Sequence, residues 1–250
     1  MLIPVLAQKS LLSLSLAASM FFNNDYYSSG MDAVPSSSTI ISSSSTTSTT
    51  AVLPIPFQRY ETANDIPLSY YKDQKVIRGR VIKVIDGDTI RVRHTPLYPL
   101  NKGRDCKKAI SQCTISVRLY AVDAPETAKR GNPGQPFAKE ATEYTSSQVL
   151  DRVVRVKLLR KDQYARVVGK VTIRNNLLPF LNKDLSAGLA EKGLASLYTG
   201  GGREYDGNRD QLERRIEKAK QKKLGIWSGR DGDYVDPAQY KRDVKEGNGK

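Results

Sequence analysis

The sequence has little of what a transition-metal site needs. Its 250 residues include one histidine and two cysteines. Two thiols and the distant His94 do not supply the four ligands of a structural zinc ion. Cys106 and Cys113 lie in a polar stretch with six residues between them. They form either a local disulfide, in an oxidising compartment, or two free thiols.

The N-terminal region lacks a hydrophobic run long enough to span a bilayer. Leu11–Phe22 has about 12 residues, the length of a signal-peptide core. Lys9 precedes it, residues 1–24 contain no acidic residue, and the arginine enrichment of mitochondrial presequences is absent. We predict that residues 1–24 are a cleaved targeting segment or an uncleaved membrane anchor. Either one leads to the secretory pathway or an organelle rather than to the cytosol.

The following stretch lacks the apolar residues that a core requires. In the segment 36–50, 13 of 15 residues are serine or threonine, and Pro54 and Pro56 follow. Such a composition cannot bury enough apolar surface to offset its ordering entropy. We therefore predict a disordered linker over 25–71, a folded domain over 72–230 that begins between Tyr70 and Val76, and a flexible basic tail over 231–250.

Acidic residues are outnumbered by basic ones, 26 to 40, which gives a net charge of +14. Residues 1–71 hold two basic and four acidic residues, so the excess of positive charge lies in the remainder of the chain. A basic folded part is the electrostatic footprint of a protein that binds a polyanion such as nucleic acid. A soluble protein with a generally basic surface is the other interpretation of the same charge.

The order of predicted elements indicates an α+β domain. Three strands, a helix, two strands and two helices fit a five-stranded Greek-key barrel of the OB type with about three helices. The predicted strands are Val76–Ile85, Thr89–Arg93, Thr114–Val122, Val153–Leu159 and Arg166–Ile173, and the predicted helices are Gln135–Leu150, Lys183–Lys192 and Asn208–Lys223. The stretch His94–Cys113 is too long for a hairpin turn and is interpreted as an insertion.

Three short stretches carry charged residues suited to one reaction. They are Asp86-Gly87-Asp88-Thr89, the run from Arg118 to Glu126, and Asp162-Gln163-Tyr164-Ala165-Arg166. Each alone is weak evidence, because such residues are commonly turns, helix caps or surface ion pairs. Together they supply carboxylates for a divalent cation and a water, and guanidinium groups for a phosphate.

One detail opposes a shared site. Strict alternation along the third strand places Ile115, Val117, Leu119 and Ala121 on the core face and Arg118 on the other face. The same alternation puts Arg118 and Asp123 on opposite faces. They share a site only if the chain bends or bulges after Val122, as strand ends beside active sites often do.

With these motifs the chain resembles the staphylococcal-nuclease-like (thermonuclease) family over about 76–228. The matching motifs are Asp86–Thr89, Arg118–Glu126, Asp162–Arg166, Gly193–Ala195 and Leu224–Trp227. The sequence His94-Thr95-Pro96 and the run from Arg160 to Tyr164 are most similar to the membrane-anchored fungal endonuclease branch of that family. That branch also has an apolar N-terminal segment.

The resemblance implies roles for five residues. Asp88 and Asp123 would bind Ca²⁺. Glu126 would orient or deprotonate the attacking water. Arg118 and Arg166 would bind the scissile phosphate and stabilise the transition state.

The resemblance also implies supporting roles for three further residues, and the chain departs from the family's pattern at two positions. Asp86 and Asp162 would stand behind the residues that touch metal and phosphate, and Tyr164 would contact the substrate. Ala124 stands where a well-known member has threonine, whose backbone carbonyl binds the metal, so alanine serves equally. Gln163 replaces a lysine that contacts substrate phosphate, which weakens binding modestly.

We therefore expect a calcium-dependent endonuclease that cleaves DNA and RNA with little sequence preference, because the chain shows no module that reads bases. The alternative is a non-catalytic nucleic-acid-binding OB module. Degenerate copies of that kind have usually lost the acidic or arginine positions, all of which this chain keeps. We infer no protein partner from the sequence.

Overall fold

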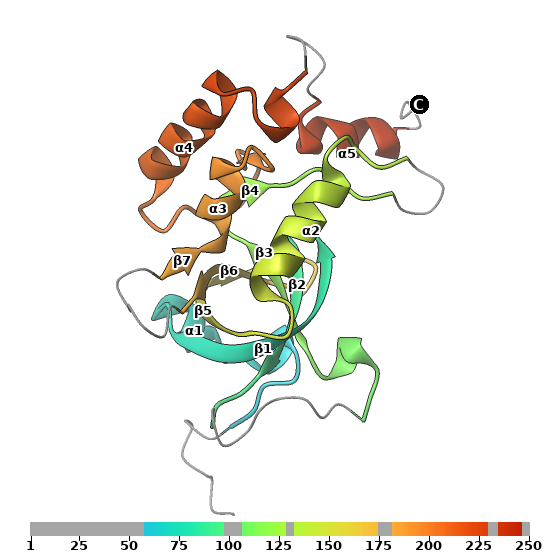
Figure 1. Ribbon diagram of the computed structural model, residues 1–250. Coiled ribbons are helices and arrows are strands. Elements are labelled where there is room, and N and C mark those ends of the chain that lie inside the picture. Colours follow the sequence, from blue (N-terminus) through green and yellow to red (C-terminus); the bar gives the residue numbers. More distant parts are fainter. Residues whose placement is uncertain (1–57, 98–106, 129–132, 175–181, 230–234, 247–250) are drawn as a thin grey trace, which may run out of the picture. The chain divides into compact units, whose positions relative to one another are not determined.

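The computed structural model describes residues 58–97, 107–128, 133–174, 182–229 and 235–246 (Figure 1). The predicted targeting segment and the serine- and threonine-rich stretch lie outside the described residues. Among the helices of the described ranges, none is long and apolar enough to cross a membrane.

Five strands form a closed barrel. They pair antiparallel in the order β3-β2-β1-β5-β6, and a parallel pairing of β3 with β6 closes the sheet on itself. The strands are β1 (Val76–Asp86), β2 (Thr89–His94), β3 (Ile115–Leu119), β5 (Val153–Lys161) and β6 (Val167–Ile173). This barrel confirms the predicted α+β class and OB-type topology.

Three two-residue strands were not predicted. β4 (Val122–Asp123) pairs with β8 (Ser196–Leu197), and β7 (Lys183–Asp184) pairs with the end of β6. The expected helix start at Lys183 is therefore wrong by two residues. Asp184 instead caps the helix that follows, because its side chain accepts a hydrogen bond from the Ser186 backbone nitrogen.

The three predicted helices are present as α2 (Ala138–Val149), α3 (Leu185–Glu191) and α4 (Arg209–Gln221). The described part of the chain adds α1 (Leu68–Lys72) and α5 (Pro237–Lys245). Helix α5 lies within the segment expected to be a flexible tail, so that expectation is wrong for these residues. A proline at the first turn, whose missing backbone donor costs nothing there, favours this helix start.

The alternating apolar residues of the strands fill the barrel. Buried side chains of all five strands form one cluster with α2 and α3, and α2 packs across β1. A second cluster joins the outer side of the barrel to α3 and α4; its buried members are Tyr120, Ala121, Leu159, Val168, Ala187, Ala190, Leu212 and Ile216. Side chains therefore pack against both faces of β6, and this packing holds the strand in place.

The folded part begins earlier than the expected Tyr70–Val76. Tyr60 is only 2% exposed, and Ala63 and Ile66 are buried in the same cluster. The Tyr60 ring stacks on His94 with 5.1 Å between ring centroids, and its backbone nitrogen donates to His94 Nδ1 at 3.0 Å. Residues 58–71 are therefore part of the domain and not of a disordered linker.

Cys113 is buried and disulfide-bonded. Its position follows a short 3-10 helix, Ile110–Gln112, and directly precedes β3. Cys106, the other cysteine of the chain, lies outside the described residues.

Gly87 at the β1–β2 turn is required by close packing. A Cβ atom there would lie 2.7 Å from the Ala124 Cβ and 2.8 Å from the Ala141 Cβ. The Gly87 carbonyl also accepts a hydrogen bond of 2.7 Å from Thr145 Oγ1 on α2. The Asp-Gly sequence that indicated a hairpin turn thus also lets the turn dock on α2.

We expect Gly87→Ala to destabilise the domain by about 1–3 kcal/mol, because the added methyl group must displace the turn or α2. Urea unfolding measures this loss. Gly201→Ala is the matched control, since a Cβ there meets nothing within 4 Å. An equal and small change in both variants would contradict the packing explanation.

Titration of His94 should make the stability of the domain depend on pH. Burial, followed by the nearby positive charge of Arg59, lowers the pKa of His94 from 6.5 to about 4. The unfolded chain takes up this proton at higher pH than the folded chain. The contribution of His94 is therefore fully present above pH 6.5 and is lost as pH falls toward the folded pKa.

Between about pH 7 and pH 5, wild type should lose about 2 kcal/mol more unfolding free energy than His94→Gln, which cannot take up this proton. Because the chain has a single histidine, one imidazole NMR resonance reports the pKa directly. A resonance that titrates near 6.5, or parallel pH profiles for the two proteins, would refute the prediction.

Candidate active site

The residues predicted for the site converge in the structure. A cavity of about 880 Å³ is lined by Asp86, Arg118, Asp123, Glu126, Asp162, Tyr164 and Arg166. Asp88, the remaining predicted residue, lies behind this surface and contacts Arg118. Three stretches that are far apart in the sequence thus meet at one place.

A sharp turn at Ala121 brings Arg118 and Asp123 together. Ala121 has φ 63, in the left-handed region, and the Val122 backbone nitrogen donates to the Tyr120 carbonyl at 2.8 Å. This three-residue turn ends β3 and reverses the alternation of side chains. The expected bend therefore exists, but it lies before Val122 and not after it.

Contacts from later parts of the chain hold this turn. The Tyr198 backbone nitrogen donates to the Ala121 carbonyl at 2.8 Å, beside the β4–β8 pairing. Tyr120 Oη donates to Asp184 Oδ2 at 2.5 Å, and Ser186 Oγ donates to the Tyr120 carbonyl at 3.0 Å. Because of the turn, Ala121 packs in the second cluster and not in the barrel core as its alternation predicted.

Arg118 is the electrostatic centre of the site. Its Nη2 donates to Asp123 Oδ1 at 2.5 Å and lies 3.4 Å from Asp88 Oδ2. Its guanidinium carbon also lies 5.2 Å from the centre of the Tyr198 ring. Burial lowers the pKa of Arg118, but the charges of Asp88 and Asp123 outweigh burial and raise it overall. Arg118 is therefore a permanent and firmly placed cation.

The carboxylates of Asp88 and Asp123 suit a hard cation. They are 3% and 2% exposed, and they bring two negative charges to one guanidinium. Asp88 also accepts hydrogen bonds from Thr89 Oγ1 at 2.9 Å and from the Ala124 backbone nitrogen at 3.2 Å. Paired oxygen ligands of this kind are what Ca²⁺ prefers. No group of three or more acidic, histidine or cysteine ligands occurs within the described ranges, so water and backbone oxygens would complete such a site.

Asp86 supports this pair from the end of β1. Its Oδ1 accepts a hydrogen bond of 3.3 Å from the Asp88 backbone nitrogen. Asp86 thereby fixes the turn that carries Asp88.

Arg166 is held by a carboxylate of its own. Its Nε and backbone nitrogen donate to Asp162 at 2.7 and 2.9 Å. Burial raises the pKa of Asp162, but these hydrogen bonds and the positive charge of Arg166 outweigh it and lower the pKa. Asp162 thus orients the Arg166 side chain. Tyr164 is 70% exposed beside the Arg166 guanidinium, with 5.3 Å from the guanidinium carbon to the ring centre.

Glu126 is half-buried in the loop after β4, and Gln135 fixes its backbone. The Glu126 nitrogen donates to Gln135 Oε1 at 2.9 Å, and the Gln135 nitrogen donates to the Glu126 carbonyl at 2.8 Å. Sequence reasoning missed Gln135. A glutamine before a helix start carries no signal of such a distant partner.

Several other cavity residues were also missed. They are Arg160, Tyr198, Gly200, Gly201, Gly202, Glu204 and Arg242. The triple glycine was an available signal for the loop that follows Tyr198. No sequence signal pointed to Arg242, because this residue lies in the segment predicted to be a flexible tail.

Comparison with known proteins agrees with this geometry. The family model described as "Staphylococcal nuclease homologue" matches residues 116–229. "Endonuclease Htp3" of Saprolegnia parasitica is 40% identical over 186 residues, which cover 74% of this chain and 85% of the relative. "Probable endonuclease lcl3" of Aspergillus flavus is 39% identical over 204 residues, covering 74% and 72%. "Probable endonuclease LCL3" of Pyricularia oryzae is 41% identical over 170 residues, covering 65% of each chain. The chain therefore belongs to the staphylococcal nuclease-like family.

Proposed function

We propose that the chain is an endonuclease that hydrolyses phosphodiester bonds of nucleic acids. The observation that carries this proposal is the position of Arg118, which a rigid strand and two carboxylates hold at the wall of a cavity also lined by Glu126 and Arg166. The names of the relatives, which call them endonucleases, support the same reaction.

Arg118 and Arg166 bind the scissile phosphate. A guanidinium presents a rigid fork of donors that matches two phosphate oxygens. Each of the two arginines is already oriented by a carboxylate, at 2.5 Å for Asp123 and 2.7 Å for Asp162. Little reorganisation is needed as charge grows on the phosphate, which is the condition for strong electrostatic stabilisation of a transition state.

Glu126 orients or deprotonates the attacking water. It is a carboxylate on the wall of the same cavity, and its backbone is fixed by two hydrogen bonds to Gln135. A carboxylate positioned in this way can accept a proton from water as the bond to phosphorus forms.

Asp88 and Asp123 would hold Ca²⁺, and Ala124 would offer its backbone carbonyl. When bound, the ion supplies a Lewis acid and a template for the phosphate. Arg118 then has a second function, since its positive charge limits the repulsion between the two buried carboxylates before the ion binds.

DNA and RNA are both proposed substrates, cut with little sequence preference. The folded part carries the excess of positive charge, which favours binding to any phosphate backbone. We also propose that residues 1–24 direct the enzyme to the secretory pathway or an organelle, where they are either removed or serve as an anchor.

The direct test is digestion of a supercoiled plasmid and of RNA by the full chain with Ca²⁺ or with the chelator EGTA. We expect cleavage with Ca²⁺ and loss of cleavage with EGTA. Glu126→Gln should lower the rate about 10²- to 10⁴-fold, the usual worth of a positioned acid–base group.

Glu213→Gln is the matched control, because Glu213 pairs with Arg209 on the exposed face of α4. It should leave the rate unchanged. Equal cleavage by wild type and Glu126→Gln, with and without EGTA, would exclude the proposed reaction. Nucleic-acid binding without any cleavage would favour the non-catalytic module.

A further inference from the structure

Helix α5 forms part of the active-site wall. Its residue Arg242 lines the same cavity as Asp123 and Glu126. The family model ends at residue 229, before this helix begins. Figure 1 shows α5 beside the start of α2. The C-terminal segment is therefore placed to act on the substrate, although the family match does not include it.

Two hydrogen bonds dock this segment onto the loop that holds Glu126. Gln135 Nε2 donates to the Val235 carbonyl at 2.9 Å, and Tyr240 Oη donates to the Pro133 carbonyl. Gln135 is the residue whose other polar groups fix the Glu126 backbone. One buried glutamine thus sets the positions of both the catalytic loop and the start of α5.

The charge of Arg242 is available to an anion. Arg118 and Arg166 each pair with aspartate, but the partner of Arg242 is a neutral amide, with 2.6 Å from its Nη2 to Gln239 Oε1. Within the described part of the chain, no carboxylate lies within ion-pair distance of Arg242. Its side chain is exposed to solvent at the cavity. A cation of this kind beside a phosphate site attracts a further phosphate.

We propose that Arg242 binds the phosphate next to the scissile one, so that α5 extends the site along a polynucleotide strand. This inference rests on the proposed function. The scissile phosphate is assigned to Arg118 on β3 and to Arg166, which directly precedes β6 and is held by Asp162, whereas Arg242 comes from a separate element on the Glu126 side of the cavity. The substrate class is accordingly a strand that continues past the cleaved bond.

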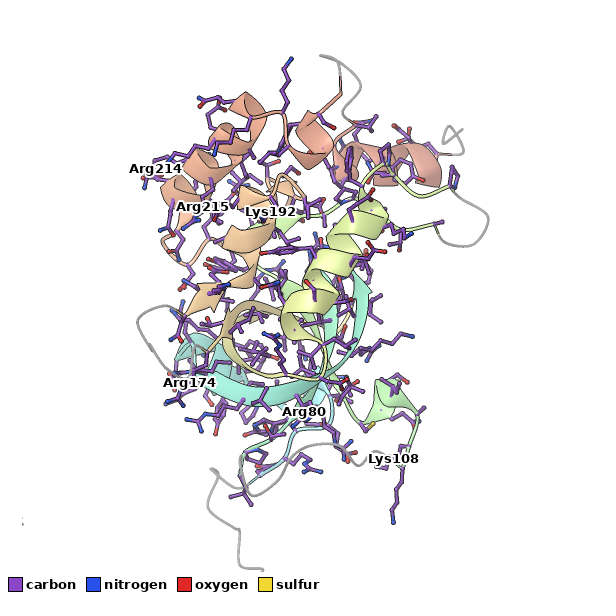
Figure 2. All side chains as sticks on the ribbon, in the orientation of Figure 1. Arg80, Lys108, Arg174, Lys192, Arg214 and Arg215 are labelled. Atoms are coloured by element: carbon purple, nitrogen blue, oxygen red, sulfur yellow. The ribbon has the colours of Figure 1, made fainter. Side chains whose placement is uncertain are left out.

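The test measures binding of a fluorescein-labelled single-stranded 12-mer by anisotropy in the Glu126→Gln background. Adding Arg242→Gln should weaken binding about fivefold at moderate salt and reduce the slope of log K against log salt by about 0.7. Arg174→Gln removes the same charge at an exposed position far from α5 (Figure 2) and should change binding less than about twofold.

A second measurement locates the phosphate. For a chromogenic nucleoside ester with a single phosphodiester, Arg242→Gln in the otherwise wild-type chain should leave kcat/KM unchanged, whereas it should raise KM for the 12-mer. Equal loss on both substrates would place Arg242 at the scissile phosphate and overturn the proposal.

Equal effects of Arg242→Gln and Arg174→Gln on 12-mer binding would also overturn it. A chain that neither binds nor cleaves the 12-mer would instead refute the proposed function itself. Circular dichroism melting of each variant confirms that the comparison is between folded proteins.

Discussion

At Ala121 the chain adopts a left-handed conformation that alanine seldom takes, and Arg118 and Asp123 lie on either side of that residue in the sequence. A non-glycine residue in this region costs about 1–2 kcal/mol. Contacts that form only because of the turn offset this cost. Tyr120 becomes fully buried, Asp123 joins the β4–β8 pairing, and Arg118 meets both aspartates. Without the turn, a regular strand would keep Arg118 and Asp123 on opposite faces.

Within the site, the positive charge of the arginines offsets the negative charge of the buried aspartates. Burying Asp88 and Asp123 without compensation would be unfavourable, because each carboxylate loses its hydration. Arg118 supplies one positive charge within 3.4 Å of both. Arg166 and Asp162 repeat the arrangement on the next wall of the cavity. The aspartates that orient the two arginines are therefore also the groups whose burial the arginines compensate.

Local sequence patterns predicted the barrel well. The alternation of Ile115, Val117 and Leu119 predicted β3 and the outward direction of Arg118, and both are confirmed. The turn at Ala121 was misplaced by one residue, because alanine is no turn signal. Distant partners, the Tyr198 backbone and Asp184, determine the conformation there.

The same reason explains the other errors. Tyr60 follows a proline-rich stretch, and its burial depends on His94, 34 residues further along. Gln135 gains its role from Glu126 and from Val235, 100 residues away. Arg242 joins the cavity only because α5 docks on that loop. Motifs identified the charged residues of the site, but the segments that hold and surround them were specified by tertiary contacts.

The central claim is that the turn at Ala121 places Arg118 and Asp123 in direct contact. A double-mutant cycle tests this most directly, with the unfolding free energies of wild type, Arg118→Gln, Asp123→Asn and the double variant measured in urea. Because the two side chains form a buried hydrogen-bonded ion pair at 2.5 Å, we predict a coupling energy of about 2 kcal/mol. Additive effects, with a coupling energy near zero, would contradict this contact and the site built on it.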